Sequence, residues 1–113
     1  PLVTRDNLGA AMQAAVRYHR EGGLREAEAL YRQVLALAPE HVPALSGLGM
    51  IEHAGGRHEG ARELVLRAMA LGAAEAGYFM NLGAICVAAG RDAEAETAFR
   101  EAIARDPRYG DPY

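Results

Sequence analysis

The sequence predicts an all-α solenoid built from three helix-turn-helix repeats, with six helices and the start of a seventh. The first observation is recurrence: residues 26–39 and 94–107 read almost alike and lie 68 positions apart, which is twice a 34-residue period. A weaker copy, residues 60–73, lies midway. The second observation is composition, because the apolar share depends on alanine, the best helix former, with few aromatic residues.

The 113 residues are expected to form one domain whose repeats span residues 8–41, 42–75 and 76–109. We expect residues 110–113 to start a truncated fourth repeat, because Asp111 followed by Pro112 is typical of a helix start. A stacked array needs a polar cap on its last repeat. We therefore expect the chain to be a segment of a longer protein.

The first repeat divides at Gly22–Gly23, where glycine can end the first helix, and its second helix should stop before Pro39. The apolar residues of that second helix follow the three-and-four spacing of one buried face. They are Ala27, Leu30, Tyr31, Val34 and Leu35. Glu28 and Arg32 lie four apart on the opposite, solvated face.

The middle repeat divides at Gly55–Gly56, and its second helix should start after Arg57. Gly72 is expected to help end that helix, because Ala73 stands where the other repeats have proline. The buried face should contain Ala61, Leu64, Val65, Ala68 and Met69.

The third repeat divides at Gly90, and its second helix should run from after Arg91 to before Pro107. Glu96 and Arg100 repeat the solvated pair of the first repeat. The buried face should contain Ala95, Ala98, Phe99, Ala102 and Ile103.

Composition excludes several functional classes. The net charge is -3 and no cluster of Lys or Arg is visible, so the basic face that a nucleic-acid-binding protein needs is missing. No apolar run could span a bilayer and no signal peptide is present, so we expect no membrane partner and a cytoplasmic location. Cys86 is the single cysteine, and its apolar neighbours predict a buried, inert thiol.

The repeats resemble the tetratricopeptide repeat family, in bacterial proteins as elsewhere, over essentially the whole chain from Leu8 onward. The residues that carry the resemblance are Leu48–Gly49, Leu82–Gly83, Ala27, Ala61, Ala95, Tyr31, Phe99, Pro39 and Pro107. The resemblance implies a right-handed superhelix in which small residues lie where paired helices cross. Departures are Ala14–Ala15 for the Leu-Gly pair, Val65 for the aromatic residue, and Glu52 where the first repeat has Tyr18. We expect Glu52 to face water; if it is buried, Arg17 or Arg20 could pair with it.

The resemblance also implies that the first helices line a concave face that binds an extended peptide or a partner helix. Carried over position by position, that face contains Met12, Gln13, Val16, His19, Arg20, Ser46, Met50, His53, Met80, Asn81, Ala84 and Val87, together with the small residues Gly47, Ala54 and Ala88. It is a soft, weakly charged surface, and methionine adapts to apolar ligands.

Two subclasses of the family make specific expectations possible. One binds the C-terminal carboxylate of chaperones through Lys, Asn and Arg, but the matching positions are Met12, Val16, Gly47, Gly77 and Asn81, so that activity should be absent. The repeat arm of O-linked N-acetylglucosamine transferases uses a ladder of Asn. The matching positions are Gln13, Gly47 and Asn81, so the middle position of the row has no polar side chain. Asn81 could equally make a local hydrogen bond between helices.

No residue pattern indicates catalysis, a cofactor or a metal. There is no nucleophile–base pair, Gly-rich phosphate loop or carboxylate pair with a shared pocket. His19 and His53 occupy the same offset in adjacent repeats, roughly 8–10 Å apart if their helices are neighbours, but with no converging acid or thiol they should only line the groove. His41 and His58 suggest nothing specific.

The sequence thus predicts a non-catalytic protein-interaction scaffold, not an enzyme, with a protein or peptide as partner. The alternative is a substrate-positioning repeat arm of a larger bacterial glycosyltransferase or sulfotransferase. Weak self-association through exposed ends of the array is a third hypothesis, in which Ala98, Ala102 and Ile103 meet the incomplete helix at Tyr113 or another molecule.

Overall fold

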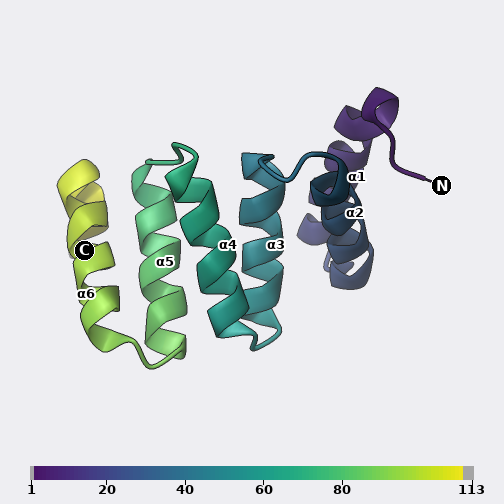
Figure 1. The fold of residues 1–113 in the computed structure, drawn as a ribbon. Helices are drawn as coiled ribbons and strands as arrows, with labels where there is room; N and C mark the ends of the chain where they lie inside the picture. The colour runs from purple at the N-terminus through teal and green to yellow at the C-terminus, as the bar shows by residue number, and fades with distance from the viewer. Residues whose placement is uncertain (1, 111–113) are drawn as a thin grey trace.

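The computed structural model describes residues 2–110 as a row of six α-helices that extends over 45 × 27 × 25 Å (Figure 1). The helices are α1 (Leu8–Arg20), α2 (Leu24–Leu37), α3 (Val42–Ala54), α4 (His58–Ala70), α5 (Ala76–Ala88) and α6 (Asp92–Arg105). Short 3-10 helices, η1 (Arg5–Asn7) and η2 (Pro107–Gly110), flank them. The described residues contain no strand, and the predicted all-α solenoid of helical hairpins is confirmed.

Each repeat is a helical hairpin, formed by α1 with α2, α3 with α4, and α5 with α6. Ala27, Ala61 and Ala95 are almost completely buried inside these hairpins, which lets each helix pair approach closely. In the third hairpin the Phe99 ring leaves no room for a side chain on Gly83, because a Cβ atom there would lie only 2.4 Å from the ring. The predicted helix-crossing role of the small residues agrees with this packing.

The turns and helix starts follow the local sequence. Gly22, Gly56 and Gly90 adopt positive φ angles of 85°, 83° and 78°, which glycine reaches without steric cost. At the start of α3, the Nδ1 atom of His41 accepts a hydrogen bond from the Ala44 backbone N–H at 3.3 Å. His41, for which the sequence suggested nothing specific, therefore caps this helix.

Successive hairpins join into one apolar core. One cluster of buried residues combines α1, α2 and α3 around Tyr31, and another combines α4, α5 and α6 around Ile85. A third, around Leu45 and Ala68, links the middle hairpin to its neighbours. We call the contact of α2 with the α3–α4 hairpin the first junction, and that of α4 with the α5–α6 hairpin the second junction.

The described residues include no helix with the length and apolar character needed to cross a membrane. The truncated fourth repeat was predicted to start over residues 110–113. Gly110 ends η2, and residues 111–113 lie outside the described residues.

Candidate functional site

The twelve residues predicted for the concave face all lie on the first helices of the hairpins, α1, α3 and α5, and none of them is buried. Gln13, Val16, Arg20, Ala84 and Val87 are exposed, and the other seven are partly exposed. They are thus available to a partner, although this assignment of a binding site stays a prediction.

Charge is distributed very unevenly between first and second helices. Within α1, α3 and α5 the charged residues are Arg17, Arg20 and Glu52, and α5 has none. Each of α2, α4 and α6 carries at least four, several of them in pairs along one helix. The predicted pairs Glu28–Arg32 and Glu96–Arg100 are both present. The first helices therefore offer a nearly uncharged surface beside an ion-rich one.

Tyr31 explains why the row formed by Gln13, Gly47 and Asn81 lacks a middle side chain. Tyr31 is 2 % exposed, and a Cβ atom on Gly47 would lie 2.4 Å from its Cζ. A side chain at position 47 therefore fits only if this buried ring shifts. The Tyr31 hydroxyl lies 3.4 Å from Nδ1 of His19, and burial raises the pKa of Tyr31.

The expectation that Glu52 faces water is wrong. Glu52 is 7 % exposed. Its carboxylate accepts a hydrogen bond from Arg32 at 3.1 Å and forms an ion pair with Arg57 at 2.9 Å. Neither Arg17 nor Arg20 is its partner. Arg32 belongs to α2 of the preceding repeat, so the ion cluster ties the first junction together, and a buried carboxylate needs such partners.

The second junction carries its own ion cluster. Arg62 of α4 donates two hydrogen bonds to Glu94 of α6, at 2.7 and 3.0 Å, and Arg91 binds Glu59 in the same two-pronged way, at 2.9 and 3.0 Å. The Arg62 guanidinium lowers the pKa of the Glu94 carboxyl. Charge-assisted pairs of this geometry orient the hairpins relative to each other.

Cys86 occupies the place in the third repeat that Glu52 occupies in the second. Its thiol is buried and lies 3.5 Å from the Glu94 carboxylate, and burial raises its pKa. A thiol that stays protonated is a poor nucleophile, so the prediction of an inert cysteine agrees with its environment.

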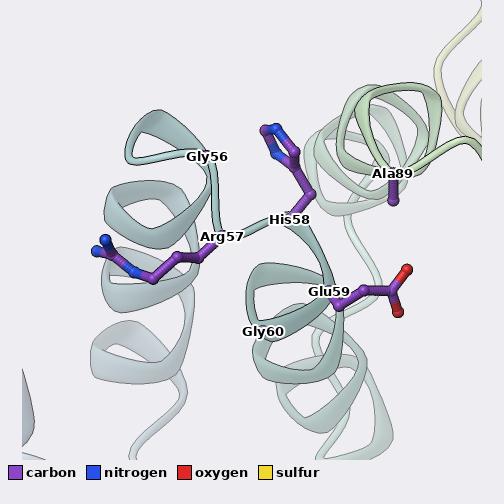
Figure 2. Close-up of a pocket in the computed structure, with 6 residues that line it drawn as sticks. All are labelled: Gly56, Arg57, His58, Glu59, Gly60 and Ala89. Atoms are coloured by element: carbon purple, nitrogen blue, oxygen red, sulfur yellow. The ribbon is translucent and has the colours of Figure 1, made fainter.

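A hollow of about 420 Å³ lies where the α3–α4 turn approaches the end of α5 (Figure 2). It is lined by Gly56, Arg57, His58, Glu59, Gly60 and Ala89. Figure 2 shows Arg57 turned towards α3 and Glu59 turned the opposite way. Arg57 forms an ion pair with Glu52, and Glu59 forms one with Arg91. The turn therefore presents His58 between two charged groups that already have partners.

The two histidines predicted for the concave face, His19 and His53, have different neighbours. His19 approaches Tyr31, whereas Nδ1 of His53 lies 3.0 Å from Nδ1 of His58. The sequence suggested nothing specific for His58, so its contact with His53 was not predicted. The available signal was a pair of histidines on either side of a Gly-Gly turn. Among the described residues, no group of three or more His, Cys, Asp or Glu could hold a metal ion.

The ends of the array differ from the sequence-based expectation. Ala98 and Ala102 of α6 are 4 % and 0 % exposed, so they are not part of an exposed apolar end, and Tyr113 lies outside the described residues. Ile103 is 40 % exposed. At the opposite end, Leu2 is 82 % exposed and lines a hollow of about 210 Å³ with Leu30 and residues of α1.

Comparison with known proteins gives one consistent family. Two family models, each described as "Tetratricopeptide repeat", match residues 12–76 and 76–109. Among solved structures, a mutant of the O-GlcNAc transferase of Thermobaculum terrenum is similar over 95% of this chain, with a TM-score of 0.86 and 33% sequence identity. The chain spans only 21% of that transferase. No curated protein matches the sequence.

Two further structures with the same fold contain peptides. The Yersinia enterocolitica type III secretion chaperone SycD, in complex with a peptide of the translocator YopD, has a TM-score of 0.82 and 19% identity, over 95% of this chain and 84% of that one. The first repeat domain of Spaghetti (RPAP3), bound to the HSP90 peptide SRMEEVD, has a TM-score of 0.83 and 16% identity, over 94% and 84%. At these identities the likeness shows the fold.

Proposed function

The chain belongs to the tetratricopeptide repeat family, and on that premise we propose that it is a non-catalytic interaction module whose first helices bind an extended peptide or a partner helix. In this proposal the repeats are residues 8–41, 42–75 and 76–109, and each starts with the first residue of α1, α3 or α5. Two structural neighbours bind peptides, which supports a protein or peptide as partner.

The observation that carries the proposal is the near absence of charge on exposed first helices. Charged side chains keep most protein surfaces solvated, and a nearly uncharged exposed face favours a partner that covers it. Met12, Met50 and Met80 supply flexible apolar contacts on three successive first helices. Asn81 adds an amide that can bond to peptide backbone. The expected partner is therefore largely apolar where it touches the groove.

The test is an NMR titration with peptides chosen by selection. A random-peptide display library is selected against the folded chain, and the enriched peptides are titrated into ¹⁵N-labelled protein. We expect the largest shifts at the amides of Met12, Met50 and Asn81. Shifts confined to α2, α4 and α6, or a selection without any enriched peptide that binds, would contradict the proposal.

The HSP90 peptide SRMEEVD serves as a probe of specificity. The positions that would grip its C-terminal carboxylate hold Met12, Val16, Gly47, Gly77 and Asn81, and four of these five side chains lack a group that binds a carboxylate. We expect no saturable binding of SRMEEVD by isothermal titration calorimetry. Binding that disappears when the peptide is amidated at its C-terminus would show that a carboxylate grip exists here after all.

A second candidate is that the chain acts as a substrate-positioning arm of a larger glycosyltransferase. The 33% identity to the Thermobaculum terrenum transferase favours it, as do Gln13 and Asn81 on either side of Gly47. The deciding observation is the full reading frame: a transferase domain in the same polypeptide supports the arm, and its absence refutes it. In either case the residues described here perform no chemistry in this proposal.

Self-association through an end of the array is the third proposal, and the exposed Leu2 and the neighbouring hollow support it. Sedimentation velocity over a wide concentration range is expected to show a weak, reversible dimer, which Leu2→Glu should abolish. A strictly monomeric profile at high concentration would refute this idea.

A further inference from the structure

His53 and His58 meet across the turn between α3 and α4. His53 lies in the last turn of α3, and His58 is the first residue of α4. Gly56, with φ +83°, reverses the chain between them, and the Arg57 backbone N–H donates to the Glu52 carbonyl at 2.8 Å. The turn therefore brings the two imidazoles together, with ring centroids 5.0 Å apart.

The two facing nitrogen atoms have the spacing of two ligands on one metal ion. Nδ1 of His53 and Nδ1 of His58 are 3.0 Å apart. Metal–imidazole bonds are about 2.0–2.1 Å long, so two such bonds at angles from square to tetrahedral place their nitrogens roughly 2.9–3.4 Å apart. Without a metal, one Nδ1 must carry a proton and the other must accept it. A metal ion can take the place of that shared proton. Each ring is then neutral, with its proton on Nε2 and a free lone pair on Nδ1 for the metal.

We propose that His53 and His58 chelate one divalent transition-metal ion at the α3–α4 turn. Imidazole nitrogen favours Cu²⁺, Ni²⁺ and Zn²⁺ over Mg²⁺ and Ca²⁺, which prefer oxygen, and affinity should follow the order Cu²⁺ > Ni²⁺ > Zn²⁺ at equal geometry.

Water completes the coordination shell in this proposal. No third His, Cys, Asp or Glu among the described residues converges with the two histidines. His58 also lines the open hollow of about 420 Å³ shown in Figure 2, which leaves room for bound water. The site is thus a two-ligand, exchangeable site and differs from a closed structural zinc site, which takes four protein ligands.

Metal binding is coupled to the fold, because the two nitrogens are this close only when the turn is formed. An ion that binds the native chain but not the unfolded one raises the free energy of unfolding in proportion to the logarithm of its concentration. Cu²⁺ should therefore raise the melting temperature of the wild-type chain.

The experiment is isothermal titration calorimetry of the untagged chain with CuCl₂ and ZnCl₂. His53→Gln and His58→Gln keep a similar volume but remove one ligand each, and His19→Gln is the matched control, at the position of α1 equivalent to His53. We expect one ion per chain, tighter for Cu²⁺, and a loss of about tenfold or more in affinity in each of the two ligand variants only.

An independent readout uses the wild-type chain alone. Substoichiometric Cu²⁺ should broaden NMR signals around the α3–α4 turn before any others. The proposal is overturned if the wild-type chain binds no ion, if His19→Gln weakens binding as much as the ligand variants do, or if the broadening centres away from this turn.

Discussion

The two junctions between repeats differ in which helix supplies the carboxylate of the ion cluster. At the first junction a carboxylate, Glu52, is buried within α3, and Arg32 and Arg57 reach it from either side. At the second junction Cys86 fills the equivalent place as an uncharged buried residue, and the carboxylate comes from Glu94 on α6. The repeat therefore determines where polar groups meet, whereas the individual side chains determine which of them carries the negative charge.

The junctions also differ in which side chain of the preceding second helix packs under the first helix. Tyr31 extends from α2 to Gly47 on α3, so a side chain at position 47 would clash with the ring unless the ring moved. One repeat later Val65 replaces the tyrosine, and Asn81 stands at the position of Gly47. Tyr31 therefore occurs with a glycine at the facing position of the next first helix, whereas the smaller Val65 occurs with the polar Asn81.

The largest loss of stability should follow when the second junction receives a carboxylate at the position where the first junction has Glu52. Cys86→Glu would place a second carboxylate within reach of Glu94, at a fully buried site whose nearby arginine, Arg62, already donates two hydrogen bonds to Glu94. We expect a loss of about 3 kcal/mol or more in the free energy of unfolding, measured by urea denaturation. Cys86→Ala is the control and should cost clearly less. Equal losses in both variants would show that charge is not what distinguishes the junctions.

A smaller loss should follow from closing the space above Tyr31. Gly47→Ala brings a methyl group against a buried ring, and overpacking of this kind costs about 1–3 kcal/mol. The matched control is Gly9→Ala on α1, where a Cβ atom meets nothing within 4 Å. That variant should gain about 0.5–1 kcal/mol from helix propensity. The two changes in unfolding free energy should thus have opposite signs, and a stabilised Gly47→Ala would refute the explanation of the missing side chain.

The smallest expected effect is the contribution of Glu94 to the loss of stability at acidic pH. Arg62 lowers the pKa of Glu94 below its ordinary value of 4.5, so the pair stabilises the folded chain above that pH. This contribution is lost as the pH falls through the lowered pKa of the folded state. Denaturation of the wild-type chain and of Glu94→Gln in a series of buffers should show a shallower decline below pH 4.5 for the variant. Parallel curves would exclude Glu94 as a contributor.

The fold could be predicted from the sequence because it depends on period. A 34-residue recurrence, with glycine at each turn and alanine at each helix crossing, can be recognised in the sequence without a structure. The environment of Glu52 could not be predicted, because its partners come from positions 20 residues before and 5 after it, and only stacking brings them together. The contact between His53 and His58 was missed for a similar reason, since the conformation of a turn decides whether its two ends meet. Which exposed residues bind a partner depends on a second molecule and stays a prediction.

The central claim, that the first helices bind the partner, is tested most directly by one matched pair of variants. Ala84 on α5 and Ala29 on α2 are both exposed alanines within a helix, one on the proposed face and one on the ion-rich second helices. The affinity of a selected peptide is measured by calorimetry for Ala84→Arg and Ala29→Arg. The proposal predicts a loss of about tenfold or more, roughly 1.4 kcal/mol, for Ala84→Arg alone. Unchanged affinity in Ala84→Arg, or an equal loss in Ala29→Arg, would contradict it.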